Sequence, residues 1–159
     1  MNKVLSNLEE LNIEYKLYEH EAVFTVEEAE AIDIEIPGAH CKNLFLRNRK
    51  GNVHYLVILE SQKRLDLKSL SKKINSTSLS LASSERLMKH LGVIPGSVTV
   101  FGLINDLENT VELIVDQDLK KFGTINFHPN VNTATINIKY EDFEKFVKSR
   151  GKNIKYLEF

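Results

Sequence analysis

Hydrophobic residues recur at helical spacing in four segments of the chain, and each segment predicts an amphipathic helix. A fifth helix, over TVEEAEAI, is predicted to be short, acidic and exposed, because Thr25 and Glu28 have the spacing of a capping box. The four apolar stripes are Val4, Leu5, Leu8 and Leu11; Leu67, Leu70 and Ile74; Leu87, Met88 and Leu91; and Phe143, Phe146 and Val147.

Polar residues and glycine predict the ends of two of these helices. Asp66 precedes the second stripe and Ser83 or Ser84 precedes the third, and such side chains accept hydrogen bonds from the free amides of a first helical turn. Gly92 follows Leu91 and is expected to end its helix in a left-handed conformation. The segment GVIPGSV is then predicted to be a loop.

Alternating or short apolar segments predict strands in the rest of the chain. These segments are YKLYEH, KNLFLRN, NVHYLVILE, VELIVD, TINFH, TATINIK and NIKYLEF. Turn residues from Asn48 to Gly51 join the second and third segments, and NVHYLVILE is apolar on both faces, which is typical of a central strand. FHPNVNTATINI reads as two short strands around a tight turn, and it raises the question of what His128 does there.

Helices interspersed among such strands favour an α+β fold, in which helices cover a mixed β-sheet. The 159 residues, 42% of them hydrophobic, suffice for one core, so we expect one compact domain over residues 1–159. No apolar run approaches the length of a membrane span, and MNKVLSNLEELN lacks the apolar centre of a signal peptide. We therefore expect a cytoplasmic protein with no membrane partner.

The formal net charge of -1 hides an uneven distribution of charge along the chain. Residues 1–35 carry net -8, residues 36–100 carry net +8, and the remaining 59 residues carry net -1. No acidic residue occurs from Cys41 to Leu59, where Lys42, Arg47, Arg49 and Lys50 lie within nine positions. This block is either a solvated face that balances the acidic N-terminal segment or a surface for a phosphate-rich partner such as one end of a structured RNA.

The residues able to carry chemistry are one cysteine, one lysine and five histidines. His54 lies inside an apolar strand and His90 near a helix end, and both are interpreted as structural. A single cysteine and scattered histidines do not predict a disulfide, a metal or another cofactor. Cys41 is expected to be a small core residue, because adjacent strand residues point to opposite faces and His40 would be a poor base for it. Lys42, between a glycine turn and an apolar strand, either reaches solvent or binds an anion.

Three segments together carry a resemblance to a known family: GAHCKNLFLRN, GVIPGSVTVFGLIND and FHPNVNTAT. With HEAVFTVEEAEA near the start, they resemble the YbaK/prolyl-tRNA-synthetase-associated editing family over nearly the whole chain. The likeness is greater to its freestanding ProX-type members, which remove alanine mistakenly attached to proline tRNA. The cysteinyl-tRNA branch has a glycine-rich stretch in place of FHPNVNTAT, so that segment favours the alanyl branch.

The resemblance implies a compact α+β domain that hydrolyses the ester between an amino acid and the terminal adenosine of proline tRNA. It assigns the main functional role to Lys42, as an anchor for the phosphate of the terminal nucleotide, and places His128 as a wall of the amino-acid pocket, with Ile94 or Val98 nearby. It implies no cofactor, because the neighbouring ribose hydroxyl helps to activate water. The residues implied to orient the substrate are Asn43, Gly92, Val93, Ile94, Pro95, Gly96 and Ser97.

Other functions remain open at this point. The same basic face would serve a binding module for tRNA or protein without turnover. A deacylase for cysteinyl-tRNA(Pro) and a hydrolase dependent on Cys41 are further alternatives, although the family commonly has threonine at that position. The acceptor end of proline tRNA is the expected partner, and the resemblance leaves open whether prolyl-tRNA synthetase is another.

Overall fold

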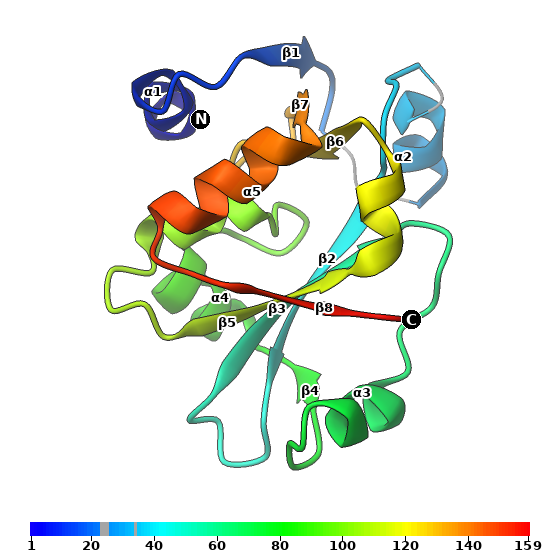
Figure 1. Cartoon of the computed structure of the whole chain (residues 1–159), viewed down its shortest axis with the longest axis vertical. Helices are drawn as coiled ribbons and strands as arrows, with labels where there is room; N and C mark the ends of the chain where they lie inside the picture. The colour runs from blue at the N-terminus through cyan, green and yellow to red at the C-terminus, as the bar shows by residue number, and fades with distance from the viewer. Residues whose placement is uncertain (23–25, 34) are drawn as a thin grey trace.

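The computed structural model describes residues 1–22, 26–33 and 35–159 (Figure 1). Its elements follow the predicted order, with an additional short strand, β4, and two 3-10 helices, η1 and η2. The elements are α1 (Asn2–Glu10), β1 (Tyr15–Glu19), α2 (Val26–Asp33), β2 (Cys41–Arg47), β3 (His54–Glu60), α3 (Leu67–Lys73), β4 (Ser80–Leu81), α4 (Ser84–Leu91), η1 (Val100–Asn105), β5 (Val111–Asp116), η2 (Gln117–Lys121), β6 (Thr124–Phe127), β7 (Ala134–Lys139), α5 (Tyr140–Ser149) and β8 (Ile154–Leu157).

The larger sheet has five strands in the order β4-β2-β3-β5-β8. The β2–β3 pair is antiparallel, whereas β3–β5 and β5–β8 are parallel, so this sheet is mixed as predicted. β3 lies at its centre, and its residues from His54 to Leu59 are all buried. The apolar run NVHYLVILE is therefore the central strand that its composition indicated.

A second, antiparallel sheet contains three strands in the order β1-β7-β6, where the sequence predicted a single sheet. Periodicity shows that a strand forms but does not show which strand pairs with it, and Tyr15 of β1 pairs with Ile138 of β7. The two sheets meet at Ala39, just before β2. Its amide donates to the Thr124 carbonyl at 2.9 Å, and its carbonyl accepts from the Asn126 amide at 3.1 Å.

The main hydrophobic core lies between the two sheets and α5 (Figure 1). Its aromatic centre contains Phe101, Phe127, Phe143 and Phe146, and the rings of Phe101 and Phe146 are 5.1 Å apart in an edge-to-face arrangement. The α5 stripe predicted from the sequence thus faces this core. A second apolar cluster, including Leu46, Val57, Leu70 and Ile114, includes residues of β2, β3 and β5 together with α3. The larger sheet is consequently covered on both faces.

The local signals for helix ends are confirmed by hydrogen bonds. Asp66 accepts from the Ser69 amide at 3.1 Å, Ser83 accepts from the Arg86 amide at 3.2 Å, and Gly92 ends α4 with φ 65°. The predicted cap Thr25 lies outside the described residues, but α2 does expose Glu27 and Glu28.

The predicted apolar stripe of α4 is only partly confirmed. Leu87 and Leu91 are buried, whereas Met88 is 52% exposed because it lies off the face that meets η1. Among the described residues, no helix combines the length and apolarity needed to cross a bilayer.

Candidate active site

A cavity of about 120 Å³ opens where α2, the start of β2 and the β6–β7 hairpin meet. An adjoining cavity of about 180 Å³ lies between β2 and the loop that follows α4. Cys41, Asn43 and His128 line both cavities, so they form the wall between them. The first cavity is lined by His20, Ala29, Ile32, His40, Cys41, Asn43, Asn126, Phe127, His128 and Thr135.

Asn43 reaches this wall because alternate residues of β2 face the same side, which places its side chain beside that of Cys41. Its Nδ2 lies 3.7 Å from Cys41 Sγ, and its Oδ1 is buried and has no hydrogen-bond donor among the described residues. An unpaired buried carbonyl oxygen costs about 1–3 kcal/mol, and native folds generally avoid such groups. The amide oxygen of Asn43 is therefore a ready acceptor for a ligand in the cavity.

Cys41 is half-buried, and its thiol donates to the Asn126 carbonyl at 3.5 Å. This contact ties the side chain to the backbone of β6, which agrees with the structural role predicted for it. The expectation that His40 and Cys41 would point apart is wrong, because His40 lies before the strand begins and both residues line the first cavity. His40 Nε2 is 2.7 Å from the Ile36 carbonyl, so this nitrogen is a donor and not a free base.

His128 follows β6 and is half-buried at the mouth of the hairpin. Its Nδ1 donates to the Ala134 carbonyl at 3.0 Å, which ties the ring across the turn to the first residue of β7. Its ring centroid is 6.4 Å from that of His20, in an edge-on arrangement. A ring held at both cavities has the position predicted for a pocket wall.

The loop after α4 places only part of the predicted substrate-binding segment at the site. Ser97 N donates to the Ile94 carbonyl at 3.1 Å and closes a tight turn around Pro95 and Gly96. Gly96, the third residue of the turn, has φ 91°, a positive value that favours glycine. Gly96 and Val98 then line the second cavity.

The other residues of that loop lie elsewhere. Gly92 faces Asn105 at the end of α4, where a β-carbon would contact the Asn105 amide. Ile94 is 56% exposed and Pro95 is also exposed, whereas Ser97 is buried. None of these four is among the residues that line the two cavities.

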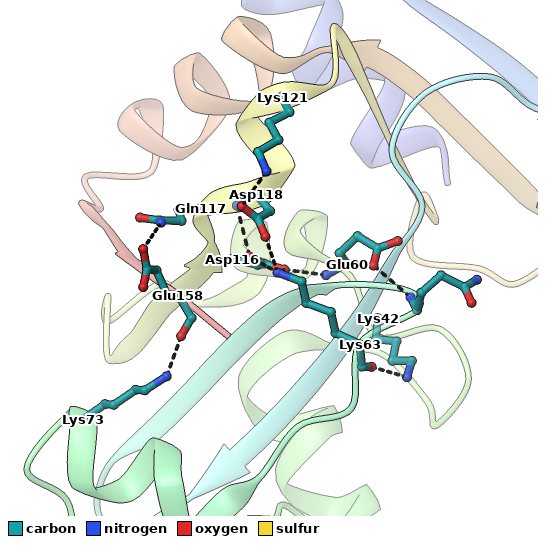
Figure 2. A network of polar contacts seen from close by, with 10 residues as sticks. Lys42, Glu60, Lys63, Lys73, Asp116, Gln117, Asp118, Lys121 and Glu158 are labelled. Carbon is teal, nitrogen blue, oxygen red and sulfur yellow. Dashed lines mark hydrogen bonds and ion pairs between the residues drawn. The ribbon is translucent and has the colours of Figure 1, made fainter.

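Lys42 lies on the opposite face of β2 from Asn43, as the alternation of the strand requires. Figure 2 shows Lys42 beside Lys63 and its carboxylate partners. Its side chain is exposed, and Nζ donates to the Lys63 carbonyl at 2.6 Å. Lys63 itself binds Asp116 at 3.0 Å and Asp118 at 2.6 Å. Within the described part of the chain Lys42 has no carboxylate partner, so its charge is not neutralised by a neighbouring acid.

The ion pairs beside Lys42 shift the pKa values of their members. Burial alone would lower the pKa of Lys63, but its hydrogen bonds to Asp118 and Asp116 outweigh that effect and raise the pKa. The hydrogen bond from Lys63 and a second one from Lys121 lower the pKa of Asp118. Lys63 is thus held by two carboxylates, whereas the Lys42 ammonium donates to a backbone carbonyl and keeps its charge available to an anion.

Two asparagines that the sequence analysis did not single out hold the site together. Asn126 Nδ2 donates to the carbonyls of Pro37 and Ala39 at 2.9 and 3.1 Å, and Asn137 Nδ2 donates to the Pro37 carbonyl at 3.0 Å and to Asn126 Oδ1 at 2.9 Å. Gly38 passes so close to Thr124 that any β-carbon there would overlap its hydroxyl. The alternating polar positions of TINF and TATINIK were the available signal, because asparagine is rare inside strands.

The remaining histidines divide between the site and the core. His54 is 5% exposed and stacks on Phe45 at 5.4 Å and on His90 at 4.1 Å, away from both cavities. Burial, reinforced by the charges of His90 and Arg86, lowers the pKa of His54 to about 4, so it is neutral near pH 7. The structural interpretation of His54 and His90 agrees with this placement. His20, which had no assigned role, lines the first cavity together with Thr135.

The fold and this site can be compared with known proteins. A family model described as an aminoacyl-tRNA editing domain matches residues 20–146, which is most of the chain. The chain belongs to the aminoacyl-tRNA editing domain family. That match contains Asn43, the loop at Gly96 and His128, and it confirms the resemblance found in the sequence.

Relatives of this editing domain are similar over most of their length. The chain is 46% identical over 155 residues to the prolyl-tRNA editing protein ProX of Acetoanaerobium sticklandii, covering 98% of this chain and 94% of that protein. It is 36% identical over 143 residues to prolyl-tRNA synthetase associated domain-containing protein 1 of Danio rerio, covering 89% and 77%. A crystal structure described as that of a candidate trans-editing enzyme for prolyl tRNA synthetase has a TM-score of 0.71 at 21% identity, covering 99% and 96%, and shares the fold.

Proposed function

We propose that this chain is an aminoacyl-tRNA deacylase that acts in trans on proline tRNA and hydrolyses its ester with alanine, with residues 1–159 acting as one editing domain. The observation that carries the proposal is the small cavity lined by both His128 and Asn43, whose Oδ1 has no hydrogen-bond partner among the described residues. The relative that is 46% identical is named a prolyl-tRNA editing protein, which supports the same substrate.

The size of the cavity sets what part of the substrate enters it. An engineered cavity of about 150 Å³ is just large enough for benzene, so a cavity of about 120 Å³ holds a small amino acid but not a nucleoside. Ala29, Ile32 and Phe127 offer apolar surface for a methyl group. The terminal adenosine then lies outside, toward the second cavity and the turn at Gly96.

The reaction needs positioning more than a protein nucleophile, because the ester of an aminoacyl-tRNA is already activated. Water attacks the ester carbonyl carbon, the bond from that carbon to the ribose oxygen breaks, and the ribose oxygen takes up a proton. The neighbouring ribose hydroxyl is the group that assists the water. Asn43 holds the amino acid, His128 limits the size of the pocket, and Lys42 binds a phosphate from the other face of β2.

To spare the correct prolyl ester, the amino-acid pocket must exclude the proline ring. A hydrophobic pocket gains only about 1–3 kcal/mol from an added methylene, and the larger proline ring would be the one to gain. The imidazole of His128, held by the Ala134 carbonyl, gives the pocket a rigid wall. We therefore assign the discrimination between alanine and proline to His128.

The test is the release of labelled amino acid from alanyl-, cysteinyl- and prolyl-tRNA(Pro) by the purified chain. We expect alanine release and little proline release, and we expect Cys41→Ser to retain this activity. An Asn43→Ala variant should lose at least about tenfold in kcat/KM through the lost hydrogen bond, while Asn153→Ala, at an exposed asparagine, should match the wild type.

Other outcomes would select the other functions. Binding of tRNA without release of any amino acid would indicate a binding module. Preferential release of cysteine would indicate a cysteinyl-tRNA(Pro) deacylase. Loss of activity in a folded Cys41→Ser variant would indicate a hydrolase that depends on Cys41. Gel filtration of the chain with prolyl-tRNA synthetase decides whether the two proteins associate. A substrate of this kind places the reaction in the cytoplasm.

A further inference from the structure

His20 and Thr135 form a polar pair in the first cavity that the mechanism above does not use. β1 and β7 are antiparallel, with Tyr18 opposite Thr135, and the His20 amide extends the ladder by donating to the Thr133 carbonyl at 2.9 Å. Since side chains two residues apart lie on one face of a strand, His20 is on the same face as Tyr18 and Thr135. His20 Nε2 is 3.0 Å from Thr135 Oγ1.

The hydrogen bonds of His20 determine which way the threonine hydroxyl points. Nδ1 is 2.9 Å from the Glu21 carbonyl, which can only accept, so Nδ1 carries the proton. In the neutral ring, Nε2 is then an acceptor, and the Thr135 hydroxyl donates its only proton to it. Thr135 Oγ1 consequently offers only lone pairs to other partners.

The residues that line the cavity therefore include two with an acceptor oxygen, one from β2 and one from β7. Asn43 Oδ1 belongs to β2 and has no donor among the described residues. Thr135 Oγ1 belongs to β7, and its hydroxyl proton is donated to His20 Nε2. Both residues line the cavity of about 120 Å³, and no carboxylate is among the described residues that line it. A group with two or more N–H donors and no negative charge is the chemical complement of such a site.

We propose that Asn43 Oδ1 and Thr135 Oγ1 together bind the α-amino group of the substrate's amino acid, with His20 as the positioning residue that fixes Thr135 as an acceptor. This inference rests on the proposed function, because the α-amino group it places belongs to the aminoacyl ester. An α-hydroxy acid of the same size has one donor and leaves one acceptor unpaired. The site thus selects amino acids over hydroxy acids.

The test uses two analogues whose linkage the enzyme cannot hydrolyse: 3′-amino-3′-deoxyadenosine joined through an amide to alanine or to lactic acid. Affinities are measured by NMR titration, which also reports the side-chain amide of Asn43. We expect the wild type to bind the alanyl analogue at least about tenfold more tightly than the lactoyl analogue, the value of one hydrogen bond to a charged group.

Variants separate the subsite from a merely structural effect. Thr135→Val should reduce the alanyl-to-lactoyl affinity ratio to within about threefold, whereas Thr135→Ser, which keeps the hydroxyl, should retain the wild-type ratio. His20→Ala should lower the ratio less than Thr135→Val, because the hydroxyl remains but is free to rotate. A purely structural role for His20 would weaken both analogues equally and leave the ratio unchanged.

A wild-type ratio near one, no binding of either analogue, or an unchanged ratio in folded Thr135→Val would each overturn the subsite. Failure of the wild type to deacylate alanyl-tRNA(Pro) would overturn the proposed function instead. Because the affinity ratio is measured without turnover, the two failures are distinguished.

Discussion

Replacing Asn137 with alanine tests whether the buried amides join the two sheets. Asn137 is 6% exposed, and its Nδ2 group contacts the Pro37 carbonyl at 3.0 Å, Thr124 Oγ1 at 3.1 Å and Asn126 Oδ1 at 2.9 Å. Alanine removes all three contacts. The Pro37 carbonyl keeps a donor in Asn126 Nδ2, but Asn126 Oδ1 loses the donor that the structure provides.

The expected cost follows from these contacts. Two lost hydrogen bonds contribute about 0.5–1.5 kcal/mol each, and the orphaned oxygen of Asn126 adds about 1–3 kcal/mol. Since part of this is offset by relaxation and by water entering the space, we expect the free energy of unfolding to fall by about 2–4 kcal/mol. That is a large fraction of the 5–15 kcal/mol or so typical of a domain.

Urea unfolding followed by circular dichroism measures the change. The matched control is Asn153→Ala at an exposed position, which should change the free energy of unfolding by less than about 0.5 kcal/mol. Asn126→Ala combined with Asn137→Ala should cost less than the sum of the single changes, because the two side chains share a hydrogen bond. If Asn137→Ala is no more destabilising than the control, the amides do not hold the sheets together.

Four further predictions follow, three for side chains at the site and one for the buried His54. Lys42→Ala should lower deacylation about ten- to a hundredfold in a folded protein, through loss of a charge-assisted hydrogen bond, and wild-type turnover would contradict the phosphate anchor. Cys41→Ser and Cys41→Thr should stay within a few-fold of the wild type, because the thiol is a donor to a backbone carbonyl, and total loss in both with normal circular dichroism would restore a thiol mechanism. His128→Ala should raise the ratio of prolyl to alanyl ester hydrolysis while lowering alanine release, and an unchanged ratio would show that the imidazole does not shape the pocket. Arg86 Nη1 donates to His54 Nε2 at 3.0 Å, and burial lowers the pKa of His54 to about 4. In the unfolded state this histidine has its ordinary pKa of about 6.5, so the unfolded state takes up the proton at a higher pH than the folded state does. The free energy of unfolding should therefore fall as the pH drops from about 6.5 to about 4. His54→Phe should flatten that fall in the free energy of unfolding, and an equal slope in both proteins would refute the assignment.

Elements whose signals lie within a few residues could be predicted from the sequence. The N-caps Asp66 and Ser83 and the left-handed Gly92 were expected and are present, because a cap bonds to amides or carbonyls of the adjacent helical turn. The central strand was evident because burial on both faces leaves only apolar residues. The order of short motifs was also enough to indicate the family, and the resemblance singled out Asn43 and His128, which both line the cavity.

Tertiary structure decided how those residues meet. β1 pairs with β7, from the other end of the chain, and this pairing brings His20 to Thr135 and separates the strands into two sheets. It also buries Asn126 and Asn137, whose side chains hydrogen-bond to each other and to backbone carbonyls of a distant loop. A motif places Lys42 and Asn43 side by side in the sequence, yet the pleat of β2 directs them to opposite faces, and only the packed sheet determines which face has the cavity. Pairing and burial depend on contacts between distant segments, for which the local pattern of the chain has no signal.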